Sequence, residues 1–238
     1  MGGRGSWTKR NKNWMPSQGG ASGKESDQLR PLISGGSRRN TLDNFRRVIG
    51  DSNVEYSAVM DEKGRAMGSI RRGNQHSTSV DTSYAFSHKE STIMHNHPDK
   101  HWGGTFSDAD LQMHSIMGNR GIVATAKEGT YHMIRTSKTD YAGFGRAYNK
   151  ADPMLKAEWR RKWADISSKK TFKTAAAREK AERQVFVGVY HKWFKENASK
   201  YGLNYVFEKS AKMAKRSSVN INKTYKDWLG QSDSIYGD

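Results

Sequence analysis

Charged residues divide this 238-residue sequence into three parts. Residues 1–40 carry eight basic and two acidic residues, residues 41–136 carry eleven of each, and residues 137–238 carry twenty-two basic and eleven acidic residues. The apolar fraction is only 34% and the mean hydropathy is −0.93, so not all of the chain has enough apolar surface to fold compactly. The sequence therefore predicts one compact core in the neutral middle part, with flexible or extended basic flanks.

The N-terminal flank, residues 1–40, combines eight glycines with Ser, Lys and Arg, a composition typical of a disordered basic arm. Trp7 and Trp14 within it are either base-stacking or anchoring residues, or isolated aromatics in a disordered tail. Thr41 fits an N-cap, and the apolar positions that follow it predict a short helix that ends at Gly50. Order is expected to begin at Thr41.

The middle part alternates between strand and helix patterns, which is typical of a single α+β domain of about one hundred residues. In residues 54–60 the apolar positions alternate, and this places Glu55 away from the apolar side. We also expect a turn over 61–64, strands over 65–72 and 91–98, a helix from Ser107 to about Gly118, and a closing hairpin over 121–136. His114 is expected on the surface of that helix.

The C-terminal flank, residues 137–238, has helical periodicity and forms a basic, aromatic-rich helical region. Asp152 and Pro153 suit the start of one helix, and a second helix is expected from about Thr174 to Tyr201. The basic side chains here are either a solvated face or a surface that contacts nucleic-acid phosphates, and the net charge of +11 favours the latter. The tryptophans of the first helix favour packing between helices over base stacking.

The segment HNHPDKHWGGTFSDAD, residues 95–110, concentrates groups that bind metal ions. Side chains two apart in a strand share a face, so His95 and His97 can act together as imidazole ligands. The loop that follows is long enough to bring Asp110 back to them as a third ligand. The sequence has no cysteine, so a site for Zn²⁺ must use such nitrogen and oxygen ligands, and three protein ligands leave a position for water.

Two further residues complete the predicted chemistry. Water bound to zinc has a pKa of about 7, and a carboxylate beside it can accept the proton; Glu55 is the candidate for this base. Ser107 can donate a hydrogen bond to the oxyanion. Each assignment has an alternative without metal, since Ser107 and Asp110 also fit a helix N-cap pair and Glu55 also fits a solvated strand residue.

The order of these motifs resembles the signature of the JAMM (MPN+) metallopeptidases: an upstream Glu55, HNHP at 95–98, and SDAD at 107–110 at the start of a helix. The family includes isopeptidases that act on ubiquitin conjugates, phage and bacterial relatives, and the RadC proteins. The resemblance covers residues 41–136. The loop between the second histidine and the serine is nine residues rather than the usual seven, which leaves Asp108 or His101 open as a partner in place of the Ser107 and Asp110 pair.

The resemblance implies a JAMM/MPN-like fold, also described as cytidine-deaminase-like, in which helices flank a mixed β-sheet. It also implies that His95, His97 and Asp110 bind Zn²⁺, that Glu55 is the base, and that Ser107 supports the oxyanion. The chain would then be a zinc metallopeptidase or isopeptidase that hydrolyses an amide bond in a protein or peptide substrate.

Two other functions are compatible with the same sequence. One is a nucleic-acid-binding protein, phage- or virion-associated, that uses this fold as a scaffold and contacts nucleic acid through residues 1–40 and 137–238. The other is a metal-dependent phosphodiesterase. No apolar run reaches the roughly 18 residues of a membrane span, and no signal peptide is evident, so we expect a cytoplasmic or virion-associated protein. The sequence predicts no oligomeric state.

Overall fold

The computed structural model describes residues 23–49, 52–75, 77–98 and 105–209. Within them the helices and strands follow one another along the chain in this order: α1 (Gly23–Ile33), α2 (Arg38–Ile49), β1 (Tyr56–Met60), β2 (Ala66–Arg72), α3 (Thr82–Ser87), β3 (Thr92–Asn96), α4 (Asp108–Met117), β4 (Gly121–Ala126), β5 (Gly129–Arg135), α5 (Tyr141–Lys169), α6 (Ala175–Asn197), the 3-10 helix η1 (Ala198–Tyr201) and β6 (Leu203–Lys209). None of the helices in these ranges has the length and hydropathy needed to span a bilayer.

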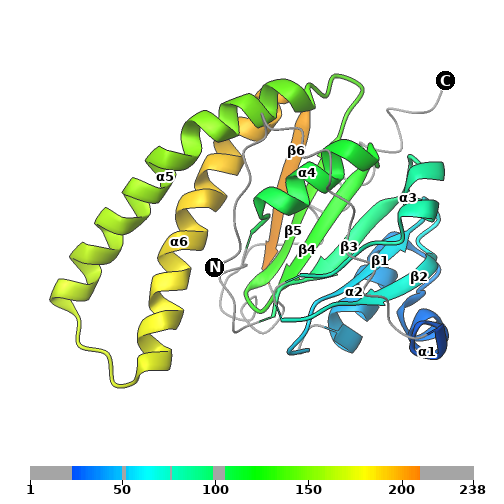
Figure 1. Ribbon diagram of the computed structural model, residues 1–238, viewed down its shortest axis with the longest axis horizontal. Coiled ribbons are helices and arrows are strands. Elements are labelled where there is room, and N and C mark those ends of the chain that lie inside the picture. The colour runs from blue at the N-terminus through cyan, green and yellow to red at the C-terminus, as the bar shows by residue number, and fades with distance from the viewer. Residues whose placement is uncertain (1–22, 50–51, 76, 99–104, 210–238) are drawn as a thin grey trace.

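The six strands form one mixed sheet in the order β2-β1-β3-β4-β5-β6 (Figure 1). Neighbouring strands are antiparallel, except that β3 and β4 are parallel and are joined through α4. A parallel pair requires such a crossover connection, because a short turn can join only antiparallel neighbours. The predicted α+β class, with helices flanking a mixed sheet, is confirmed.

Helices cover both faces of the sheet and separate two hydrophobic clusters. On one face, α1 and α2 pack onto Met94 and Val123 of the central strands. On the other face, α4, α5 and α6 pack onto Ile93 and Ile122. Adjacent residues in a strand point to opposite faces, so β3 and β4 contribute to both clusters and are buried on both sides. The metal-ligand motif at the end of β3 is therefore carried by the best-buried part of the sheet.

The expected disordered arm over residues 1–40 is wrong for its second half. Residues 23–33 form α1 and α2 begins at Arg38, while Trp7 and Trp14 lie outside the described residues. Ile33 is fully buried against the sheet. Thr41 is not an N-cap but a buried residue inside α2, where its hydroxyl accepts from the Gly35 N–H and donates to the Gly64 carbonyl. Apolar residues at helical spacing outweigh the glycines around them once the sheet supplies a surface to pack on.

The expected boundary at residue 136 also fails, because the chain returns to the sheet after its two long helices. Strand β6 pairs with β5 along its length, with Tyr131 opposite Phe207. Residues 137–209 therefore belong to the same fold and are not a separate helical extension. The sequence did not predict β6, because this strand directly follows a helix and has no hairpin partner next to it in sequence. A short alternation of apolar residues is its only local pattern.

Helix α5 begins twelve residues earlier than expected. Asp140 is its N-cap and accepts a hydrogen bond from the Gly143 N–H at 2.8 Å, whereas Asp152 and Pro153 lie in its interior. A proline there removes one backbone hydrogen bond and costs about 3 kcal/mol. Burial of Tyr148 and Leu155 on either side of the proline compensates for that loss. Asp152 instead accepts a hydrogen bond from the Tyr190 hydroxyl of α6 at 2.7 Å.

Helices α5 and α6 run side by side as a long hairpin whose far end extends beyond the sheet (Figure 1). Near its middle, Trp159 of α5 meets Phe186 of α6 edge to face, with 5.5 Å between ring centroids. The expectation that Trp159 packs between helices is therefore confirmed. In this hairpin only the half nearest the sheet adds to the main hydrophobic cluster, through residues such as Phe144 and Phe194.

Candidate metal centre

Strand β3 holds the two histidines of the motif in the middle of the sheet. His95 pairs with Ser57 of β1 and Ala124 of β4, and the His97 N–H donates to the Thr125 carbonyl at 2.7 Å. Strand geometry thus continues through His97, so both side chains point to the face that α4 covers. Both rings are buried, and their Nε2 atoms lie 3.0 Å apart.

The first turn of α4 supplies the third candidate ligand. Ser107 is the N-cap: its Oγ accepts from the Asp110 N–H, and the Asp110 carboxylate accepts from the Ser107 N–H, which forms a capping box. The carboxylate also reaches the histidines, with Oδ1 3.1 Å from His95 Nε2 and Oδ2 3.5 Å from His97 Nε2. All three ligand atoms lie within 4.8 Å of one another. Within the described residues, this is the group of histidines and acids that could hold a metal ion.

Electrostatics favour a positive ion among these three groups. Burial alone would raise the pKa of Asp110, but His95 and His97 outweigh it and hold that pKa well below its usual range. Two neutral imidazoles with their Nε2 lone pairs turned inward would repel each other and the carboxylate unless a proton or a metal cation lay between them. Neither Nδ1 atom has a hydrogen-bond partner among the described residues, so the only strong interactions of the rings are through Nε2. Two imidazole nitrogens and a carboxylate oxygen are a donor set that suits zinc.

Glu55 lies at the start of β1, on the same face as the histidines. Its backbone extends the β1–β2 ladder: Glu55 N–H donates to the Asn74 carbonyl and Gly73 N–H donates to the Glu55 carbonyl, each at 2.8 Å. Because Ser57 is paired with His95 in an antiparallel register, two residues further along the register place Glu55 opposite His97. The candidate base is thus brought to the candidate ligands.

The surroundings of Glu55 raise the pKa of its carboxyl group towards neutral pH. Burial raises its pKa to about 7; attraction to His97 and a hydrogen bond from the Thr78 backbone act against this rise, and repulsion from Asp110 adds to it. Glu55 is half-buried, so it is not the fully solvated strand residue that the alternative interpretation describes. A carboxyl group with a pKa near 7 is well matched to proton transfer at neutral pH.

Asn96 is a residue of the site that the sequence analysis missed. It is fully buried on the opposite face from the histidines, and its side chain accepts from the Tyr56 N–H at 2.6 Å and donates to the Val54 carbonyl at 3.1 Å. These two hydrogen bonds hold the backbone on both sides of Glu55 next to β3, the strand that carries the histidines. The sequence feature that could have indicated its role is a polar amide between the two histidines, on the face of the strand where Met94 is apolar.

The structure distinguishes the other candidates in this segment. Asp108 is buried and accepts a hydrogen bond from the Tyr148 hydroxyl of α5 at 2.8 Å, while His101 lies outside the described residues. His114 is not a surface residue as expected: it is fully buried, and its ring meets the Tyr141 hydroxyl and the Asn119 carbonyl. Burial lowers the pKa of His114 to about 3, so it is neutral. The covering helix α5, which buries it, could not be placed from sequence.

Ser107 makes the contacts of an N-cap and of a support for Asp110 at once. Its hydroxyl donates to Asp110 Oδ2 at 2.8 Å, and its N–H reaches the same oxygen at 2.7 Å. The capping alternative and the ligand assignment are therefore compatible, because one carboxylate can serve both. The oxyanion role of Ser107 stays a prediction, since it requires the hydroxyl proton to turn from Asp110 to the substrate.

Comparison with protein-family models, with curated proteins and with solved structures finds no match for this chain. Its likeness to the JAMM metallopeptidases thus consists of the motif residues described above and their order.

Proposed function

We propose that this protein is a zinc-dependent hydrolase of the JAMM type that cleaves an amide bond in a protein or peptide substrate. The observation that carries the proposal is the convergence of His95, His97 and Asp110, whose facing atoms are 3.0–3.5 Å apart, next to a half-buried acid from a neighbouring strand. The mixed sheet with a helix directly after the histidine strand is compatible with a JAMM-like fold.

In this proposal His95, His97 and Asp110 hold the zinc ion, which when bound acidifies water and polarises the substrate carbonyl. Glu55 accepts a proton from the attacking water and returns it to the leaving amine, a role for which a pKa of about 7 is suitable. Asn96 keeps Glu55 in position through the backbone on either side of it. Ser107 orients Asp110 by two hydrogen bonds to one of its oxygens.

The number of ligand groups favours amide hydrolysis over cleavage of a phosphodiester. Many metal-dependent nucleases and phosphatases use two metal ions about 4 Å apart, which need more carboxylate or histidine ligands than a single ion does. The described residues bring together three such ligands and no second cluster. One ion with three protein ligands and a neighbouring carboxylate is the arrangement that zinc peptidases use.

The test is cleavage of amides by zinc-loaded protein, followed by mass spectrometry on a peptide library and on isopeptide-linked lysine conjugates. Wild type and the surface control His88→Ala should both cleave, whereas Glu55→Gln should bind zinc but lose at least about 100-fold in rate, as expected for removal of a general base. Cleavage by Glu55→Gln at the wild-type rate would contradict the assigned role. Cleavage of DNA or RNA but of no amide would replace the proposal with the phosphodiesterase alternative.

A further inference from the structure

The far half of the α5–α6 hairpin carries a concentration of positive charge that the metal centre does not explain. Residues 159–180 contain eight basic and two acidic residues. Seven of these basic residues are exposed, and Lys162 is partly buried. The charge therefore lies on the surface of the part of the hairpin that extends beyond the sheet (Figure 1).

Most of this charge is not neutralised within the fold. Lys162 pairs with Glu158 at 2.6 Å and Lys169 pairs with Asp165 at 2.5 Å. The other six form no ion pair shorter than 4.0 Å with a described carboxylate: these are Arg160, Arg161, Lys170, Lys173, Arg178 and Lys180. Arg161 and Arg178 interact only at longer range, with Glu158 and Glu182 respectively. Six cations without a close ion pair, spread over the end of α5, the loop and the start of α6, create a positive potential that attracts a polyanion.

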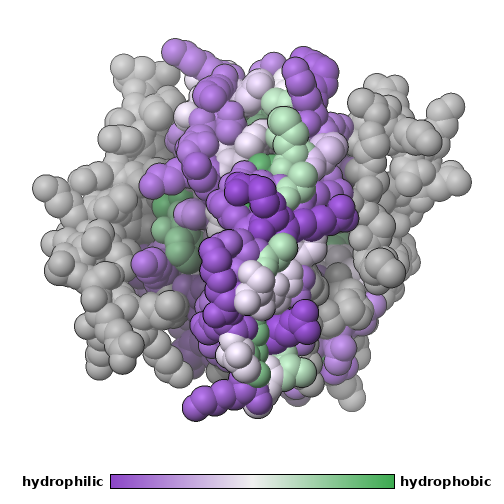
Figure 2. All heavy atoms as spheres, turned by 90° about the vertical axis from the view of Figure 1, so that its left-hand side faces the viewer, coloured by the Kyte–Doolittle hydropathy of each residue, from purple (hydrophilic) through white to green (hydrophobic). Residues whose placement is uncertain are grey.

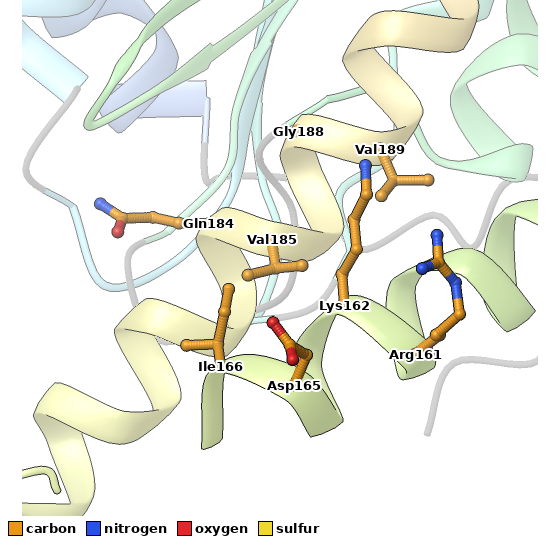
Figure 3. A pocket seen from close by; sticks show the side chains of 8 residues that line it. All are labelled: Arg161, Lys162, Asp165, Ile166, Gln184, Val185, Gly188 and Val189. Atoms are coloured by element: carbon orange, nitrogen blue, oxygen red, sulfur yellow. The ribbon is translucent and has the colours of Figure 1, made fainter. Parts of the chain in front are cut away.

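A hollow of about 570 Å³ opens between the two helices in the same region. Figure 3 shows Ile166 and Lys162 of α5 and Val185 and Val189 of α6 around it, with Arg161 and Gln184 at its two sides. Asp165 also lines it, but its charge is matched by Lys169. The hollow is thus lined by apolar side chains from both helices and, alongside them, by the polar or charged side chains of Arg161, Lys162, Asp165 and Gln184.

Gly188 keeps this hollow open. It lies in the interior of α6, and a Cβ added there would have nothing within 4 Å. Glycine in a helix interior is less favourable than alanine, so its presence where a side chain would fit is not explained by packing. A groove that must admit another molecule gives a reason for the missing side chain.

Nucleic acid fits this surface better than a membrane does. The large hydrophobic residues that are exposed within the described ranges are Leu32, Phe86, Ile116 and Met154, of which only Met154 lies on the hairpin. In Figure 2, the side of the molecule formed by the hairpin is mainly hydrophilic, with short hydrophobic patches between. Membrane-bound helices instead have a continuous apolar face.

Aromatic rings lie among the cations, as in surfaces that bind single strands. Trp163 of α5 and Phe172 in the following loop are both partly exposed, with ring centroids 5.6 Å apart. Bases stack on such rings whatever the sequence, while phosphates contact Lys and Arg nearby. An acidic peptide would use the charge but would leave the rings and the hollow without a role.

We propose that residues 159–189, which form the far half of the hairpin and the adjoining turns of α6 around the hollow, are a nucleic-acid-binding surface. Exposed side chains such as Arg160, Arg161 and Lys173 contact phosphates, and bases lie against Trp163 and in the hollow over Gly188. This function is independent of the metal centre and does not require it.

The test is fluorescence anisotropy of the full chain with a labelled single-stranded DNA of about 20 nucleotides, over a range of salt concentrations. The triple variant R160A/R161A/K173A should bind about tenfold more weakly than wild type, with a shallower dependence of log K on log salt because fewer counterions are released. The control R47A/K63A/K195A removes the same charge elsewhere and should bind within about twofold of wild type. His95→Ala/His97→Ala should bind like wild type.

Gly188→Leu tests the hollow without changing charge. Filling it should weaken binding of the single strand by about fivefold or more, the loss of one base contact. An unchanged affinity would overturn the base-binding part of the proposal. Equal losses in the two triple variants, no binding at low salt, or binding to vesicles of anionic lipid in preference to DNA would overturn the whole proposal. Circular dichroism of each variant separates a local effect from unfolding.

Discussion

The metal centre and the far half of the α5–α6 hairpin both depend on ionisable side chains, but these side chains are buried together at the centre and exposed and separate on the hairpin. His95, His97 and Asp110 are held within 3.0–3.5 Å of one another, and their side chains are 3%, 6% and 13% exposed. The hairpin cations are separate, exposed and mostly unpaired. Buried polar groups must satisfy each other or an ion, whereas exposed charges interact weakly with the fold and are screened by salt.

This difference separates what each region contributes. Changes at the centre should alter stability and metal binding, because three buried groups depend on one another. Removal of charged side chains from the hairpin should alter neither stability nor metal binding, because exposed charges contribute little to folding.

Zinc should stabilise the wild-type protein strongly. At free zinc about 1,000-fold above the dissociation constant, binding only to the folded state adds about 4 kcal/mol to the free energy of unfolding. Thermal unfolding with and without zinc measures this. His95→Ala should lose the effect, and R160A/R161A/K173A should retain it in full. Equal stabilisation of all three proteins by zinc would show that the ion binds elsewhere.

Asn96→Ala should destabilise the protein by about 3 kcal/mol, because it removes a fully buried amide side chain together with its hydrogen bonds to the Tyr56 N–H and the Val54 carbonyl. Urea unfolding measures the loss. The matched control is Asn204→Ala, at an exposed position of β6, which should change stability by less than about 0.5 kcal/mol. Similar small effects for the two variants would mean that Asn96 does not hold the chain around Glu55.

Glu55→Gln should stabilise the metal-free protein at pH 8. The pKa of Glu55 is raised to about 7 in the folded state, above its unfolded value of about 4.3, so folding favours the neutral form. The charged form destabilises the fold as pH rises between these two values, and the effect is constant above about pH 7. The gain is on the order of 2 kcal/mol at pH 8 and vanishes below about pH 4.

Chemical unfolding at both pH values, in the presence of a chelator, checks this behaviour. Glu62→Gln, at an exposed position of the β1–β2 turn, is the control and should show no such pH-dependent gain. If Glu55→Gln destabilised the protein at pH 8, the fold would stabilise the charged carboxylate of Glu55, and its pKa would not be raised.

Gly188→Ala should stabilise the protein slightly, by about 0.5–1 kcal/mol, since alanine is the better helix former and the added methyl group meets no atom within 4 Å. Thermal unfolding measures the gain. A loss of stability would show that the space over Gly188 is already filled. This effect is the smallest because it concerns helix propensity alone.

The middle of the sequence predicted most of its own structure, because its signals are local. Asp61–Gly64 forms the expected turn, Ser107 and Gly118 cap α4 as expected, and β4 and β5 form the expected hairpin. The motif also predicted which polar residues come together, since strand alternation fixes His95 and His97 and a helix start fixes Asp110. Side-chain periodicity and capping need no knowledge of distant residues.

The sequence predictions were wrong where the local structure depends on packing against segments that are distant in sequence. Ile33 is ordered by the sheet face that it covers, and Pro153 is tolerated because Tyr148 and Leu155 are buried on either side of it. Asn96 matters because β1 runs beside β3, an arrangement that no local pattern reveals. Tertiary packing overrides propensity at such positions, and composition averaged over a flank hides the few residues that pack.

We infer that His95, His97 and Asp110 together bind one metal ion. Elemental analysis of purified protein, equilibrated with zinc and then freed of excess, measures how much zinc each chain retains. We predict about one zinc per chain in wild type and in Asp108→Asn, whose carboxyl group faces Tyr148, and almost none in Asp110→Ala. Wild type without bound zinc, or Asp110→Ala with as much zinc as wild type, would contradict the account.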